Sequence, residues 1–105
     1  MTAVEKQVLE KFKELLHWKV KLHALVLFGS RARGDADPES DMDVLVVVDE
    51  LNRDVWDYVI ESAWEAGFEQ GIVVVPVVHS RDEWENGPER YSLLAQAIRA
   101  EGIAV

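Results

Sequence analysis

FGSRARGDADPESDMDVLVVV, residues 28–48, joins two apolar runs through a polar loop. The first run, Leu22–Phe28, is short, nearly continuous and rich in β-forming residues, which predicts a strand buried on both faces. Gly29 closes this strand, and residues 29–40 have the composition of a loop. A second strand is predicted from about Asp43 to Val48. The two strands and their connection are therefore the centre of the predicted fold.

Helical patterns lie on either side of these strands in the sequence. Apolar residues recur at three- and four-residue steps over Ala3–Trp18, which predicts an amphipathic helix. A second long helix is expected after residue 52, with Asn52 or Asp54 as its N-cap. Gly67 is placed to end that helix.

The last third of the chain predicts one more strand and two more helices. The apolar run Ile72–Val78 predicts a strand. Pro76 indicates that this strand lies at a sheet edge or is bulged there, because proline cannot donate to a ladder. A capping-box pattern predicts a short helix over Arg81–Glu85. A final helix is expected from about Glu89 to Ala100, and the tail 103–105 can add a short strand.

This order of elements predicts an α/β sandwich, in which a small mixed β-sheet of about three strands carries helices packed on it. A length of 105 residues is enough for one compact domain, residues 1–105. No apolar run approaches the roughly 20 residues that span a bilayer, and the first ten residues lack the order of a signal peptide. We therefore expect no membrane partner and a cytoplasmic location.

The charge of the chain limits the class of partner. Eleven basic against twenty acidic side chains give a net charge of −9, so the molecule as a whole repels polyanions. Long nucleic acid is not an expected partner. A small anion such as ATP differs, because it arrives with Mg²⁺ and needs only a local group of donors.

Two carboxylates open the second strand. Asp41 and Asp43 are two residues apart, and the period of a strand sends both side chains to the same face. Hard oxygen ligands of this kind suit Mg²⁺, which takes its remaining ligands from water and substrate phosphates. The alternative is that the two aspartates are only a solvated entry to the strand.

The turn after the first strand carries candidate phosphate donors. Gly29 lets a ligand approach the backbone closely, and Ser30 adds a hydroxyl donor. Arg31 and Arg33 follow, and guanidinium groups match phosphate geometry. The alternatives are a glycine used for its turn geometry, a serine used as an N-cap, and arginines paired with the acidic residues of the loop.

Considered together, Gly29-Ser30, ten further residues and then Asp41-Met42-Asp43 resemble the signature of the nucleotidyltransferases of the DNA polymerase β superfamily. The small size and the Ala-Arg-Gly after the serine are similar to the minimal nucleotidyltransferase (MNT) subgroup, whose members pair with helical HEPN proteins. The resemblance implies the nucleotidyltransferase fold. It also implies a small HEPN-type helical partner. We expect the protein to form a homo- or hetero-oligomer.

The resemblance implies that Gly29 and Ser30 grip the phosphates of ATP or another nucleoside triphosphate, while Asp41 and Asp43 bind Mg²⁺ and act in catalysis. Arg31 and Arg33 are further expected contacts to the nucleotide. The implied reaction transfers a nucleoside monophosphate, AMP being the expected one, to a hydroxyl of a protein or small molecule.

A third carboxylate on a later strand is usual in this superfamily, yet the predicted third strand contains none. Asp82 and Glu83 follow it and are candidates for a substitute, although a capping box also explains Glu83. A catalytically impaired, nucleotide-binding antitoxin-like subunit is therefore the alternative function.

A third hypothesis is a purely structural partner of a helical protein. It rests on the expected edge strand and on four tryptophans, because large aromatic residues are enriched at protein interfaces as well as in cores. These are Trp18, Trp56, Trp64 and Trp84.

Overall fold

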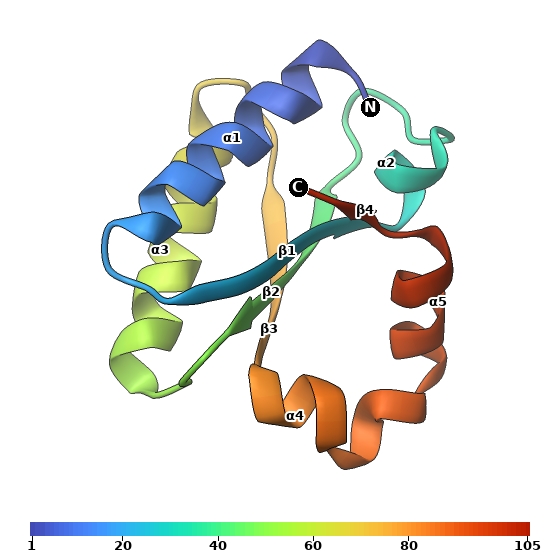
Figure 1. Ribbon diagram of the computed structural model, residues 1–105. Helices are drawn as coiled ribbons and strands as arrows, with labels where there is room; N and C mark the ends of the chain where they lie inside the picture. The colour runs from blue at the N-terminus through green and yellow to red at the C-terminus, as the bar shows by residue number, and fades with distance from the viewer.

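A mixed four-stranded β-sheet runs through the middle of the computed structural model, which describes residues 1–105 (Figure 1). The strand order is β3-β2-β1-β4. β1 pairs antiparallel with β2 and with β4, whereas β2 and β3 are parallel. The strands are β1 (Leu22–Phe28), β2 (Met42–Val48), β3 (Val74–Ser80) and β4 (Ile103–Ala104).

The helices lie on both sides of this sheet. They are α1 (Ala3–His17), α2 (Ser30–Arg33), α3 (Arg53–Phe68), α4 (Arg81–Asn86), the 3₁₀ helix η1 (Pro88–Tyr91) and α5 (Leu93–Glu101). Helices α1 and α3 pack side by side, while α4 and α5 lie on the other side of the strands (Figure 1). None of these helices is both long and apolar enough to cross a membrane.

Side-chain alternation along β2 builds two cores of unequal size. Val44, Val46 and Val48 face α1 and α3 and belong to a core of 16 buried residues. Leu45 and Val47 face the opposite way and belong to a core of only 4, which includes a residue of α5. The face under α4 and α5 is therefore the less completely covered one.

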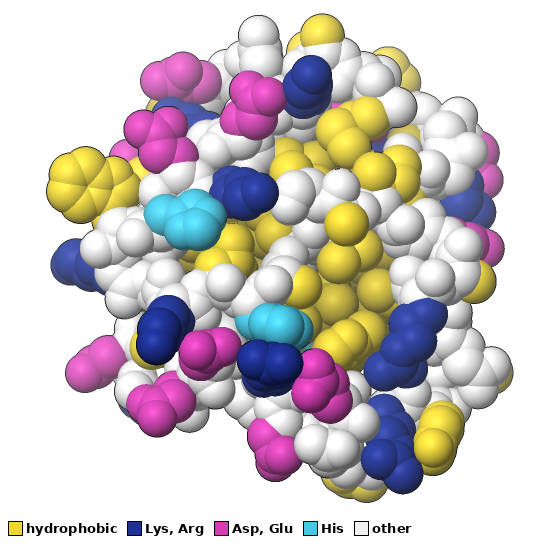
Figure 2. Space-filling view, viewed as in Figure 1, with side chains coloured by type: hydrophobic (Ala, Val, Ile, Leu, Met, Phe, Trp, Pro, Cys, Tyr) yellow, Lys and Arg dark blue, Asp and Glu magenta, His cyan; other side chains and the backbone are white.

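Apolar groups are exposed at the molecular surface where the helices cover the sheet incompletely. Figure 2 shows hydrophobic side chains gathered in the middle of the view, over β1 and between α1 and α5, with charged side chains around their margin. The sheet is thus accessible in places where a thicker layer of helices would bury it.

Most of the expected elements are present. β1 has the bounds predicted from the sequence, and Asn52 caps α3 by accepting a 2.9 Å hydrogen bond from the backbone N–H of Val55. β3 is an edge strand, as Pro76 indicated, although it begins at Val74 instead of Ile72. The sheet has four strands instead of about three, because the tail pairs with β1.

Two helix boundaries were wrong. The continuous helix expected over Glu89–Ala100 is divided at Ser92, whose extended backbone and side-chain bond from the Ala95 N–H start a new helix. Gly67 lies inside α3 instead of after it. A Cβ on Gly67 would be 2.0 Å from the carbonyl oxygen of Ile72, so this glycine serves the close approach of the helix to the following chain.

Candidate nucleotide-binding site

The turn after β1 and the start of β2 meet at one place. Phe28, the last residue of β1, is paired with Asp43 in the antiparallel ladder. Gly29 comes next, and a Cβ built on it would lie 2.5 Å from Oδ2 of Asp43. The backbone of the Gly-Ser turn therefore lies directly against the carboxylate of the Asp-x-Asp pair, as the motif spacing predicted.

Gly29 is required here for two reasons. Its φ of +76° is in the left-handed region, where a side chain is strained, and the carboxylate of Asp43 occupies the space a Cβ would need. Its carbonyl accepts the backbone N–H groups of Ala32 and Arg33, which begins the short helix α2. Ser30 is the first residue of α2 and is partly exposed.

Asp41 and Asp43 lie on the face of the sheet that carries α4 and α5, because they share the alternation of Leu45. Asp41 is exposed and Asp43 is half-buried. Burial raises the pKa of Asp43 above its ordinary value, the neighbouring charge of Asp41 raises it further, and Arg33 opposes the change. The local excess of negative charge at these two carboxylates favours a cation.

A third carboxylate is absent from this site. β3 runs parallel to β2, and Asp43 is paired with Val75, so the neighbouring position on the same face is apolar. No group of three or more histidine, aspartate or glutamate side chains is arranged to hold a metal ion anywhere in the structure. At this point the sheet thus supplies only two carboxylates, those of Asp41 and Asp43.

The proposed substitute for that carboxylate was wrong. Asp82 and Glu83 follow the opposite end of β3, beyond Ser80, which is paired with Val48 at the far end of β2. The two positions are five residue steps apart along the strand, which is about 16 Å. Glu83 also completes the capping box of α4, because its carboxylate accepts a 3.0 Å hydrogen bond from the backbone N–H of Ser80.

Arg31 has a different environment from the one expected of a phosphate ligand. Its side chain is 6% exposed and forms an ion pair of 3.0 Å with Glu5. The remaining guanidinium N–H groups donate to the carbonyl oxygens of Ser40, at 2.8 and 3.0 Å, and Pro38, at 3.1 Å. Arg31 therefore fixes the loop that leads into Asp41, and its donors are engaged within the protein.

Glu5, in the first turn of α1, also belongs to this region, although no sequence pattern linked it to the Gly-Ser turn. Burial raises its pKa, but hydrogen bonds from Thr2 and Arg31 outweigh that effect and hold the pKa below its ordinary value of 4.5. Glu5 also forms a capping box with Thr2 at the start of α1. The Thr-x-x-Glu spacing indicates the cap, whereas nothing local in the sequence indicates the pairing with Arg31.

Arg33 remains at the surface close to the two aspartates. Its guanidinium pairs with Asp35 at 3.2 Å and with Glu101 of α5 at 3.4 Å. These two acidic partners hold the pKa of Arg33 above its ordinary value. Because the pairs are exposed, they are weak and exchangeable, so Arg33 is more available to an incoming anion than Arg31.

Comparison with known proteins gives matches over most of the chain. Residues 6–97 match the family described as "Nucleotidyltransferase domain". The chain is 33% identical over 90 residues to "Putative protein adenylyltransferase MJ0141" of Methanocaldococcus jannaschii, covering 76% of this chain and 91% of that protein. It is 47% identical over 47 residues to "Putative protein adenylyltransferase MJ1379" of the same organism, and this match spans 45% of the chain and only 47% of that relative.

Solved structures with a similar fold are toxin–antitoxin complexes. A chain of a toxin–antitoxin complex with AMP-PNP has a TM-score of 0.63 and 24% identity, over 90% of this chain and 69% of that one. A chain from the complex of tri-AMPylated Shewanella oneidensis HEPN toxin with MNT antitoxin has a TM-score of 0.58 and 21% identity, over 95% and 70% of the two chains. At these identities the likeness is one of fold.

Proposed function

Because the chain belongs to the nucleotidyltransferase domain family, we propose that it binds a magnesium-bound nucleoside triphosphate at Gly29, Ser30, Asp41 and Asp43. We further propose that it transfers the nucleoside monophosphate to a hydroxyl group of an acceptor. The close approach of Gly29 to the carboxylate of Asp43 supports this proposal, because the Gly-Ser turn and the Asp-x-Asp pair then lie side by side.

The donor set fits Mg²⁺ that arrives with its nucleotide. Asp41 and Asp43 supply hard carboxylate oxygens from adjacent same-face positions of one strand, and their mutual repulsion, which contributes to the raised pKa of Asp43, is relieved by a cation. Magnesium is commonly held by one or two carboxylates together with substrate phosphates. Bound there, the ion would neutralise charge on the triphosphate and on the leaving pyrophosphate.

The other contributions to the proposed reaction come from residues of the protein itself. Gly29 lets the phosphates approach the backbone, Ser30 donates a hydroxyl hydrogen bond, and Arg33 supplies positive charge nearby. The acceptor oxygen bonds to the α-phosphorus and its hydroxyl proton passes to solvent water, while the bond from the α-phosphorus to the bridging oxygen breaks and pyrophosphate leaves with the electron pair. Arg31 holds the loop so that Asp41 stays beside Asp43.

ATP as donor and a protein as acceptor are the choices supported by the relatives. The Methanocaldococcus jannaschii relatives are named protein adenylyltransferases, and one solved neighbour contains AMP-PNP while another contains a tri-AMPylated HEPN toxin beside its MNT antitoxin. We extend from these to AMP transfer onto a small helical HEPN-type protein, within a hetero-oligomer. A cytoplasmic location is part of the same proposal.

The test uses purified protein comprising residues 1–105, Mg²⁺, α-labelled ATP and candidate acceptor proteins. We expect label to move to a protein or small-molecule acceptor with release of pyrophosphate. The double variant Asp41→Asn, Asp43→Asn should transfer no label, because it keeps the shape of the strand and removes both negative charges. Labelling that persists in this variant would contradict the proposed site.

A second function, binding without transfer, is favoured by one observation: Val75 occupies the position beside Asp43 where another carboxylate would stand. In that case the chain is an antitoxin-like subunit that holds Mg-ATP and acts by contact with its partner. Calorimetry would then give saturable, Mg²⁺-dependent binding of ATP that the double aspartate variant loses, while no labelled product forms.

A further inference from the structure

Helix α3 exposes a row of large apolar side chains to solvent. Residues at steps of four share one side of a helix, and four such positions are exposed by 42%, 39%, 65% and 67%: Trp56, Ile60, Trp64 and Phe68. We call these four residues the aromatic ridge. From Trp56 to Phe68 it spans twelve residue steps, about 18 Å of helix. Two of its rings, those of Trp64 and Phe68, lie 5.9 Å apart in a tilted arrangement.

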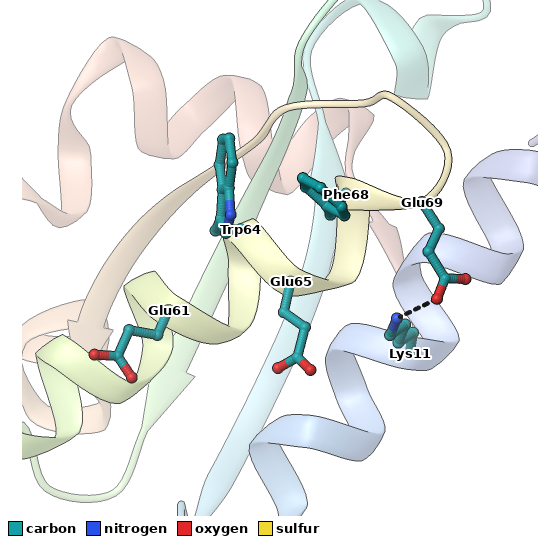
Figure 3. A pocket seen from close by; sticks show the side chains of 6 residues that line it. All are labelled: Lys11, Glu61, Trp64, Glu65, Phe68 and Glu69. Atoms are coloured by element: carbon teal, nitrogen blue, oxygen red, sulfur yellow. Dashed lines mark ion pairs between the residues drawn. The ribbon is translucent and has the colours of Figure 1, made fainter.

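An acidic row runs beside the aromatic ridge. Its members also lie at steps of four and are Asp57, Glu61, Glu65 and Glu69. In Figure 3 the Glu61 and Glu65 carboxylates project from one side of α3, while the rings of Trp64 and Phe68 project from the other. Neither Glu61 nor Glu65 is in an ion pair, so their charge is free to attract a cation from outside the molecule.

The surface between the two rows is hollowed. A groove of about 450 Å³ is lined by Lys11, Glu61, Trp64, Glu65, Phe68 and Glu69. Lys11 reaches from α1 to Glu69 at 3.7 Å across this groove, and both side chains are substantially exposed (Figure 3). The weak pair can therefore open when another charged group approaches.

The location of the aromatic ridge indicates an external partner. Its four side chains belong to neither of the two cores, which already bury the inner side of α3 through Val59, Ala63 and Ala66. A contiguous exposed apolar surface rimmed by polar residues is typical of an interaction site. Four large apolar side chains in one row, over more than three turns of helix, are more than scattered single exposures would produce.

We propose that the aromatic ridge and acidic row bind a basic amphipathic helix of a partner protein. The apolar face of such a helix would cover the Trp and Phe rings, and lysine or arginine side chains along its margin would meet Glu61 and Glu65. A second copy of this chain is disfavoured as the partner, because its net charge is −9 and its acidic row would lie close to the acidic row of the first copy. An added strand is disfavoured because Pro76 interrupts the adjacent sheet edge.

This surface lies on the α1 and α3 side of the sheet, opposite the face that carries Asp41 and Asp43. Binding there does not depend on the proposed nucleotide chemistry. The double variant Asp41→Asn, Asp43→Asn should therefore bind the partner helix as the unaltered chain does, so failure of one proposal is distinguishable from failure of the other.

The experiment uses two synthetic helical peptides of about five turns, with the same leucine face and with either lysine or glutamate along its margins. Isothermal titration calorimetry with the full chain should detect the lysine peptide and not the glutamate peptide. Trp64→Ala should weaken the affinity at least about tenfold, since interfacial tryptophans carry much of a binding energy. Tyr91→Ala is the matched control, because Tyr91 is more exposed but lies on η1, away from α3.

A charge exchange makes the test specific. The variant Glu61→Lys, Glu65→Lys should lose the lysine peptide and gain the glutamate peptide, and both substituted positions are exposed, so circular dichroism should report an unchanged fold. Equal binding of both peptides, or of neither, would overturn the proposal. A concentration-dependent dimer that Trp64→Ala abolishes would also overturn it, because the aromatic ridge would then be covered by a second copy.

Discussion

Replacing Arg31 by methionine should destabilise the protein by about 3–5 kcal/mol, the usual cost of removing one partner of a buried ion pair. The side chains of Arg31 and Glu5 are only 6% and 5% exposed, so the carboxylate that remains has little water to replace the guanidinium. The carbonyl oxygens of Pro38 and Ser40 lie nearer the surface and can bind water, so the loss of their hydrogen bonds adds nothing to this free-energy cost. For a domain of this size the loss corresponds to a melting temperature lower by at least about 12 °C.

The double variant Glu5→Met, Arg31→Met separates stability from site geometry. Apolar replacement of both partners is often neutral or stabilising, so most of the lost free energy should return, less about 1 kcal/mol for the capping bond from Thr2. Binding of Mg-ATP should stay weak in both variants, because nothing then fixes the carbonyl of Ser40 beside Asp41. Arg31→Lys should be intermediate, since lysine keeps the charge but cannot bond all three acceptors.

Urea unfolding followed by far-ultraviolet circular dichroism gives the free energies, and titration calorimetry gives the nucleotide affinity. Two results would refute the reasoning. One is a loss of less than about 1 kcal/mol for Arg31→Met, the level of an exposed pair. The other is a double variant that is as unstable as Arg31→Met alone, which would show that an isolated buried charge is not the source of the loss.

Three further predictions concern the same region. Gly29→Ala should abolish binding of Mg-ATP in calorimetry because its Cβ would meet Asp43, whereas Gly71→Ala, with φ +66° and no atom within 4 Å, should cost only about 1 kcal/mol of backbone strain and leave binding intact. Val75→Asp should increase transfer of α-labelled AMP by restoring a carboxylate beside Asp43, and an unchanged or lower rate would contradict this. The stability that Glu5 contributes is present above its unfolded pKa of about 4.5 and is lost as the pH falls through its lower folded pKa, so urea unfolding of Glu5→Gln should show a shallower acid dependence than the unaltered chain.

Local patterns were enough to predict the centre of the fold. The apolar run Leu22–Phe28 and the fixed spacing from Ser30 to Asp41 describe features that neighbouring residues determine, and the structure brings Gly29 and Asp43 together as expected. Helix caps are also local signals. The capping box before α4 predicted the start of that helix, and of the two caps proposed for α3, Asn52 and Asp54, the structure has Asn52. These signals act over a few residues.

Features that depend on distant pairing could not be read in this way. The partner of Arg31 is Glu5, 26 residues away, so the sequence suggested an arginine that contacts the nucleotide and did not show the buried ion pair. The tail was expected to add a short strand, but its two residues could not show that this strand pairs with β1, where Ile103 lies opposite Leu27. The split before α5 depends on Ser92 acting as a cap within an otherwise helical pattern.

The unequal layers around the sheet have a consequence for how this protein can diversify. Folding stability is concentrated in the core under α1 and α3, while the layer of α4 and α5 buries few residues. Substitutions in that thinner layer therefore threaten the fold less, although they lie on the face where Asp41 and Asp43 open to solvent. For the proposed transferase, substitutions in the layer of α4 and α5 are therefore the ones that can change the acceptor while the core under α1 and α3 stays unaltered.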